Sequence, residues 1–566
     1  MELLQRVRLN KTKFLIHLLI FLAGVQQFIA STWNVDPYHE GALFPTAVGI
    51  AEGRSVFAEV SQQYGFLGPL LVSLPLEIFG NYLVVQRIFG ALLMILIAWL
   101  MYLNMRSLVT PLTAKYFVIL WLGISPIWSW PFSASALSGG YWPNHLGIAL
   151  TLFSCFVILK YKTNLVYFVA GLAMFLSSQS RAEFYFVWLF VTIAIVIRSD
   201  TKRLSWLAGS LLSIVLIGIY LFVNDSTKDW YEQTLKVWTM DPPGVPIIGP
   251  NFFIFNITNF LGVTCVGFLI IAISYVLQVK YRAPQVLVLA TMVTGLVSVL
   301  LLHNQVNTNL YFRSYSFDDL INYLIKNSLF SYVNVTIILL AVILLSQFYK
   351  FRLSIIKRIS TARLPSVIFG FASIGSLSLF HNFNPDYSHM VWPIFALALV
   401  SAIGHLNSQI SQIFPLAVFK LVTLSLFSVS IIVFLTHFNE QRYAYQAPLL
   451  KGLYGNSQEQ VTSIDSDLKL VSENVMAGQM LMNCQTGLLT VNERGFLGSD
   501  KWTWNQQPSE MLLNRLDRLK LGQTMLSCNM NQLDTSRVAS LVKEGKLTVT
   551  ARGPNFLIYK VTESLR

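Results

Sequence analysis

The run from Leu83 to Leu103 reads LVVQRIFGALLMILIAWLMYL and decides the fold class. One glutamine and one arginine are its only strongly polar side chains. A helix needs about 20 such residues to cross the hydrocarbon core of a bilayer. Three further runs are of similar length and apolarity: Phe14 to Ala30, Leu204 to Val223, and Val418 to Leu435. The sequence therefore predicts several membrane-crossing helices.

The composition of the 566 residues agrees with this prediction. Hydrophobic residues make up 54% of the chain and charged residues only 12%, against roughly 25% charged in ordinary soluble proteins. The run at Phe14 is too long for the apolar core of a cleaved signal, and no small-residue cleavage site follows it. We interpret it as the first span of an all-α polytopic membrane protein.

We expect about thirteen transmembrane helices, within a range of about eleven to fourteen. The expected spans begin near Phe14, Leu83, Tyr116, Asn144, Leu165, Glu183, Ser205, Phe260, Pro284, Tyr332, Leu364, Met390 and Pro415. The short ones near Leu165, Glu183 and Leu364 are alternatively re-entrant segments.

The formal charge of +13 raises the question of nucleic-acid binding. With the N-terminus inside, 18 of the 40 lysines and arginines fall in inner segments and seven in outer loops. This bias is the positive-inside pattern. It predicts a cytoplasmic N-terminus, an extracytoplasmic C-terminus and no nucleic-acid partner; the lipid bilayer is the partner that it indicates.

Loop lengths suggest where the function lies. The predicted membrane domain covers residues 1–437, and its long outer loops are 33–82, 224–259 and 303–331. Inner loops are mostly short. Because loops on a rigid scaffold commonly carry function, we expect the site on the extracytoplasmic face.

Residues 438–566 have the composition of a soluble extracytoplasmic α+β domain. Ser509 to Leu521 has helical spacing, whereas Lys546 to Ala551 and Phe556 to Val561 predict a hairpin. Cys484 and Cys528 lie in the compartment where disulfides persist, so they are candidates for a bridge.

Two acids and a histidine follow the first predicted span: Asp36, His39 and Glu40. Polar groups this close to hydrocarbon are costly unless they have a role. They are explained by a hydrated loop start, by a general base (Asp36, or Glu40 as the alternative), or by a divalent metal site. The cluster supplies few ligands for a metal, so we expect no cofactor.

Several motifs then follow in order along the chain. They are Tyr64-Gly65-Phe66-Leu67-Gly68-Pro69-Leu70, Phe79-Gly80, Arg87 at the start of the second span, Ser125-Pro126, Tyr141-Trp142-Pro143-Asn144, Ser180-Arg181-Ala182-Glu183 and Asn384-Pro385-Asp386-Tyr387-Ser388-His389. Together with the acid after the first span, this order resembles the multi-span glycosyltransferases of the GT-C class, in their protein-mannosyltransferase and aminoarabinose-transferase-like branch. The resemblance covers roughly residues 14–435.

The resemblance implies transfer of a sugar from a polyprenyl-phosphate donor to a lipid, glycan or protein acceptor, at the outer face of a bacterial cytoplasmic membrane. The leaving phosphate needs cations, and the acceptor hydroxyl needs a base. The candidate substrate- and phosphate-binding residues are His39, Arg54, Tyr64, Arg87, Arg181, Arg313, His381 and His389. Two positions differ from the pattern of many members: Gly68 stands where they have a lysine, and Asn144 where they have a second acid.

Simpler roles are open for these cations. Arg87 and Arg181 could pair with Glu77 and Glu183, and the two histidines could cap helices. Alternative functions are a transporter or flippase for a lipid-linked glycan, an O-antigen polymerase or ligase, and a non-catalytic assembly factor. The sequence shows neither the paired halves typical of transporters nor acids in mid-span, which favours the enzyme.

Overall fold

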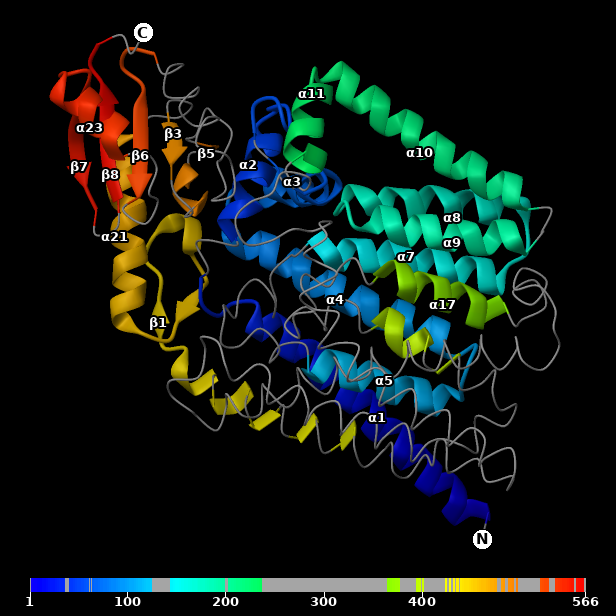
Figure 1. Ribbon diagram of the computed structural model, residues 1–566. Coiled ribbons are helices and arrows are strands. Elements are labelled where there is room, and N and C mark those ends of the chain that lie inside the picture. The colour runs from blue at the N-terminus through cyan, green and yellow to red at the C-terminus, as the bar shows by residue number, and fades with distance from the viewer. Residues whose placement is uncertain are drawn as a thin grey trace, which may run out of the picture.

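The computed structural model of the protein describes residues 2–35, 40–60, 62, 64–124, 143–198, 202–236, 364–376, 393–398, short stretches between 400 and 436, 438–475, 480–483, 487–492, 495–496, 520–528, 535–553 and 556–563. Long helices form the larger part, and a smaller part at the C-terminal end mixes strands with helices (Figure 1). The expected spans near Phe260, Pro284 and Tyr332 lie outside these residues, as does the start of the one near Pro415.

The helical part contains α1 (Glu2–Ala30), η1 (Glu40–Ala42), α2 (Phe44–Ala51), α3 (Leu67–Phe79), α4 (Leu83–Met105), α5 (Pro111–Ile124), α7 (Pro143–Lys160), α8 (Asn164–Leu176), η2 (Ser177–Gln179), α9 (Phe184–Ile197), α10 (Arg203–Val223), α11 (Thr227–Trp230), the π-helix η3 (Tyr231–Lys236) and α17 (Leu364–Ser376). Eight of these helices lie at expected spans, and residues 393–398, within the span expected near Met390, are helical as well. The predicted outer loop 33–82 is not open chain, because it contains α2 and α3.

Length and apolarity single out two of the described helices as sufficient to cross a membrane: Leu83–Met105 and Arg203–Val223. The shorter apolar helices among the described residues are Phe14–Ala30, Leu67–Phe79, Pro111–Gly123, Asn144–Lys160, Asn164–Gln179, Phe184–Ile197 and Leu364–Ser376. The number of spans therefore stays a prediction.

The outer faces of these helices are apolar and exposed. On α10, Leu204 is 71% exposed and Phe222 is 82% exposed, whereas Ser210 and Ser213 are buried. Exposed apolar surface of this extent is costly in water. The arrangement is the reverse of a soluble helix and fits contact with lipid.

Small residues allow α8 and α10 to approach closely. A Cβ at Gly209 would lie 1.9 Å from the carbonyl oxygen of Phe168, and one at Gly171 would lie 2.2 Å from that of Trp206. The hydroxyl of Ser213 donates to the Leu172 carbonyl at 2.9 Å. Small residues and hydroxyl-to-backbone bonds are typical of helix packing in membranes.

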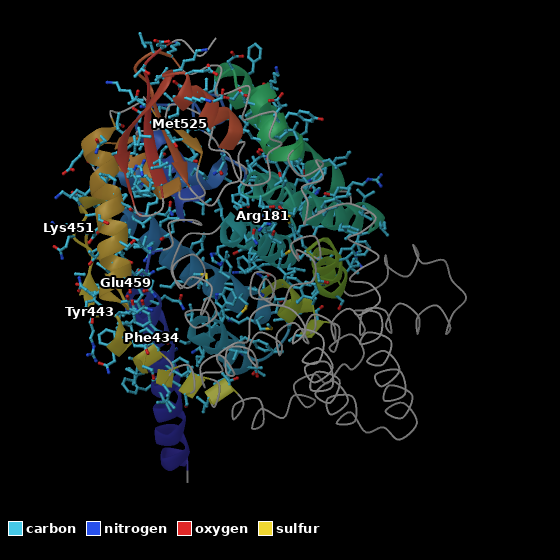
Figure 2. The ribbon with its side chains drawn as sticks, turned by 60° about the vertical axis from the view of Figure 1, so that its left-hand side comes forward. Arg181, Phe434, Tyr443, Lys451, Glu459 and Met525 are labelled. Carbon is cyan, nitrogen blue, oxygen red and sulfur yellow. The ribbon has the colours of Figure 1, made fainter. Side chains whose placement is uncertain are left out.

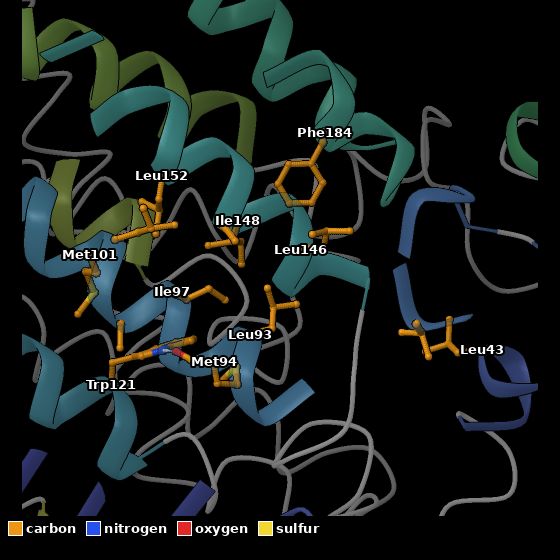
Figure 3. Close-up of a cluster of buried hydrophobic side chains, with 14 of the residues drawn as sticks. Leu43, Leu93, Met94, Ile97, Met101, Trp121, Leu146, Ile148, Leu152 and Phe184 are labelled. Carbon is orange, nitrogen blue, oxygen red and sulfur yellow. Dashed lines mark hydrogen bonds between the residues drawn. The ribbon is translucent and has the colours of Figure 1, made fainter. Parts of the chain in front are cut away.

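The core that supports the site lies between α4, α5, α7 and α9. Figure 3 shows Met94 and Ile97 of α4, Trp121 of α5 and Ile148 of α7 gathered in this core. All four side chains are almost completely buried. The N-terminal ends of α4, α7 and α9 carry the polar residues described below, so this packing sets their spacing.

The C-terminal part contains β1 (Tyr443–Ala444), η7 (Pro448–Leu450), β2 (Tyr454–Gly455), α21 (Gln458–Asn474), β3 (Met480–Asn483), η8 (Gly487–Thr490), β4 (Val491–Asn492), β5 (Gly495–Phe496), β6 (Thr524–Cys528), α23 (Thr535–Lys543), β7 (Leu547–Arg552) and β8 (Phe556–Val561). Four strands form one sheet in the order β3-β6-β8-β7. β7 and β8 are antiparallel neighbours, which confirms the predicted hairpin. The helix predicted at Ser509 lies outside the described residues.

Candidate active site

Arg87, in the first turns of α4, is completely buried and forms hydrogen bonds through all of its N–H groups. Its Nε and Nη2 bind the two carboxylate oxygens of Glu40 at 2.5 and 2.7 Å. Its Nη1 donates to the carbonyls of Ser31 at 3.2 Å and Trp33 at 2.9 Å, and Nη2 also donates to that of Asn34. A guanidinium has five N–H donors, and these five bonds use every one.

These bonds hold both ends of one short segment. Asn34 precedes residues 36–39 and Glu40 follows them, and the same guanidinium binds both. Asp36 and His39 belong to that segment and lie outside the described residues. Arg87 therefore acts as a clamp at the base of the loop that carries the predicted base.

The C-terminal part packs directly on this clamp. The Asn34 N–H donates to the Tyr454 carbonyl at 2.6 Å, and the Tyr454 N–H donates to the Thr32 carbonyl at 2.9 Å. The Trp33 ring lies 4.7 Å from that of Phe434. Tyr445 is buried close to Arg87 and Glu40, and burial raises its pKa to about 12. The end of the first helix is thus held from two sides.

Arg181, between η2 and α9, forms the second buried polar cluster, and Figure 2 shows it in the interior of the helical part. Its Nε binds Glu183 at 2.7 Å, and its Nη1 donates to the side-chain oxygen of Asn144 at 3.0 Å. The guanidinium carbon lies 5.4 Å from the centre of the Tyr64 ring, within cation–π distance. The four residues come from three separate parts of the sequence.

A glycine brings Tyr64 to this cluster. A Cβ at Gly65 would lie 1.9 Å from the Gln179 carbonyl oxygen, so only glycine lets the two backbones meet. The amide of Gln233 holds the same loop from the other side: its oxygen accepts from the Gln62 N–H at 2.9 Å, and its nitrogen donates to the Phe57 carbonyl at 2.8 Å. Sequence reasoning missed the contributions of Gln179 and Gln233, because an isolated glutamine carries no motif.

The other predicted residues are dispersed or not described. Arg54 lies in the turn after α2, is partly exposed and contacts Glu52 at 3.4 Å. Arg313, His381, His389 and Cys484 lie outside the described residues, and of Cys528 only the backbone in β6 is described. Among the described residues there is no group of three or more metal-ligating His, Cys, Asp or Glu side chains. Because Asp36 and His39 were not among them, the metal alternative stays untested.

No family model and no curated protein matches this chain. It is similar to two solved structures of ArnT from Cupriavidus metallidurans. The structure bound to undecaprenyl phosphate has 10% sequence identity, a TM-score of 0.44, and coverage of 96% of this chain and 97% of its own. The apo structure has 11% identity, a TM-score of 0.44, and coverage of 97% and 98%. At this identity and TM-score, no residue role is transferred from ArnT to this chain.

Proposed function

We propose that this chain is a membrane glycosyltransferase that moves a sugar from a polyprenyl-phosphate donor to a lipid, glycan or protein acceptor. The reaction takes place at the extracytoplasmic face of a bacterial cytoplasmic membrane. The observation that carries the proposal is the Arg87 clamp, which fixes an acid-bearing loop at the end of the first helix. The order of the sequence motifs is the second support.

The proposed chemistry needs one base. The acceptor hydroxyl attacks the anomeric carbon of the donor while its proton moves to the Asp36 carboxylate. The bond between the anomeric carbon and the phosphate oxygen breaks, and the polyprenyl phosphate leaves with the electron pair. Because this leaving group is already a stable anion, cations suffice to stabilise it and no acid has to protonate it.

The geometry supports Asp36 over Glu40 as the base. Both carboxylate oxygens of Glu40 accept hydrogen bonds from Arg87, and the side chain is buried. Its ion pair would have to break before it accepted a proton. Charge-assisted bidentate pairs of this kind are strong. We therefore propose that Glu40 holds the loop in place and does not act as the base.

We assign the phosphate-binding cations by asking which of them are not already paired with a buried carboxylate of the protein. Arg87 has no N–H group left for a phosphate, and the charge of Arg181 is balanced by Glu183. Arg54 is more accessible and its contact with Glu52 is longer. We assign the phosphate to Arg54, with Arg313, His381 and His389 as further candidates, and we give Arg181 and Tyr64 a role in binding the sugar.

Asp36→Asn tests the proposal. The amide keeps size and hydrogen bonding but cannot accept the proton, so transfer should fall by about 10² to 10⁴ while the protein inserts and folds normally. The assay follows label from a radiolabelled polyprenyl-phosphate sugar into membrane acceptors. Glu40→Gln is the comparison variant: it breaks the ion pair with Arg87, so it should lower the melting temperature as well as transfer, whereas Asp36→Asn should lower transfer alone. If Asp36→Asn stays active and Glu40→Gln loses transfer at an unchanged melting temperature, the base is Glu40. If both variants stay fully active, the base does not lie in this loop, and if wild type transfers no label, the glycosyltransferase proposal is wrong.

A further inference from the structure

A groove in the C-terminal part lies between α21 and the segment 442–449. Its volume is about 620 Å³, within the roughly 300–1,000 Å³ typical of small-ligand pockets. Tyr443 marks one wall, and Thr462, Ser466 and Ser472 of α21 mark the other. Figure 2 shows Tyr443 beside α21, on the outside of the molecule and away from Arg181.

The lining of the groove suits a neutral, polyhydroxylated ligand. Its four charged residues are Arg442, Lys469, Asp465 and Glu473, so they sum to zero. Side chains of α21 and its partner segment also place hydroxyl and amide groups along the groove. Leu449, Val461 and Leu468 add an apolar floor, and the partly exposed ring of Tyr443 offers a face for stacking. Sugars combine hydroxyl edges with apolar C–H faces, and this lining matches both.

The position of the groove connects it with the clamp and with the membrane. Tyr445 belongs to the wall segment of the groove but does not line it. It interacts electrostatically with Arg87 and Glu40 of the clamp and with Asp465 of the groove. Asp465 accepts hydrogen bonds from the Gln446 and Ala447 N–H groups at 2.7 and 3.0 Å, which fixes that wall. The exposed apolar side chains of Leu435 and Phe438 come directly before the groove in the chain, where lipid contact would end.

We infer that this groove binds a short, uncharged stretch of oligosaccharide, of about two or three sugars by its volume, as a second carbohydrate site behind the candidate active site. The groove would hold the part of a glycan acceptor that lies away from the reacting hydroxyl. The identification of that glycan as the acceptor rests on the proposed function, whereas carbohydrate binding itself does not.

The experiment measures binding without transfer. Full-length protein in detergent, as wild type and as Asp36→Asn, is applied to an array of neutral and charged di-, tri- and tetrasaccharides. The dissociation constant of the best neutral probe is then measured in solution. Thr462→Trp and Ser466→Trp fill the groove from exposed positions of α21. Gln460→Trp is the matched control, because Gln460 is exposed on the same helix outside the groove.

We expect a neutral probe to bind wild type and Asp36→Asn equally, the two groove variants to weaken binding at least about tenfold, and the control to change nothing. Absence of any binding, preference for charged probes only, or equal weakening in Gln460→Trp would overturn the inference. Oligosaccharide binding by a wild-type protein that transfers no sugar would retain the groove and reject the enzyme. Loss of transfer in Asp36→Asn, with no oligosaccharide binding by any form of the protein, would support the enzyme and reject the groove as a carbohydrate site.

Discussion

Replacing Arg87 tests whether one guanidinium holds the loop at the end of the first helix. Arg87→Met removes five hydrogen bonds and leaves the Glu40 carboxylate buried without its cation. Breaking one partner of a buried pair costs about 3–5 kcal/mol. Arg87→Lys keeps the charge but has only three donors, so at least two bonds are lost at about 1.5–3 kcal/mol each. Both variants should therefore be clearly less stable than wild type.

A double variant separates the charge from the clamp. Arg87→Met with Glu40→Leu removes both buried charges, so part of the lost stability should return. Transfer activity should not return, because the carbonyls of Ser31, Trp33 and Asn34 still lack their donor. Midpoints of thermal unfolding in one detergent rank the variants, and label transfer is measured on the same preparations.

Arg54→Met is the stability control. Arg54 pairs with Glu52 at 3.4 Å in a partly exposed turn, and removal of such a pair costs about 1 kcal/mol or less. If Arg87→Met melts at the same temperature as this control, the five bonds do not stabilise the loop and the clamp is refuted. Full transfer activity in the double variant would refute its positioning role even if stability falls.

Three further predictions concern the C-terminal part. Burial raises the pKa of Asp467 from its ordinary value of about 3.8 to about 6, so its ionisation opposes folding as pH rises through about 4 to 6, by at most about 2–3 kcal/mol because solvent screens part of the effect. Asp467→Asn should therefore melt at a higher temperature than wild type at pH 8 and not at pH 4. A reporter fused after Arg566 that works only in the cytoplasm should be inactive, and an active one would contradict the predicted orientation. Mass spectrometry of non-reduced peptides should find Cys484 joined to Cys528, and two free thiols would reject the bridge.

The helices and the hairpin of this chain could be predicted because each depends mainly on the residues within its own segment. Whether a run such as Leu83 to Leu103 becomes a helix depends on its own apolarity and length. The hairpin of β7 and β8 is also local, since the two paired strands follow each other directly in the chain. The helices that the structure describes at the expected spans and the hairpin were therefore predictable, whereas the span number, the orientation and the disulfide stay predictions.

Partnerships between distant residues were decided only by the tertiary structure. From sequence, Arg87 was a candidate for phosphate binding, and a pair with Glu77 was the simpler alternative. In the structure Glu77 is exposed, and Arg87 binds Glu40, 47 residues away. Arg181 does pair with its neighbour Glu183, yet its contacts with Asn144 and Tyr64 were not predictable.

The physical reason is the cost of burying charge. A buried guanidinium requires partners for its donors wherever the fold can supply them, and that choice depends on how the helices and the C-terminal part pack. The sequence by itself determined which segments become helices and which residues carry charge near the end of the first one. Only the packing decided that all five N–H groups of Arg87 would bind residues on either side of Asp36. The packing also decided that the C-terminal part would form hydrogen bonds with the end of the first helix.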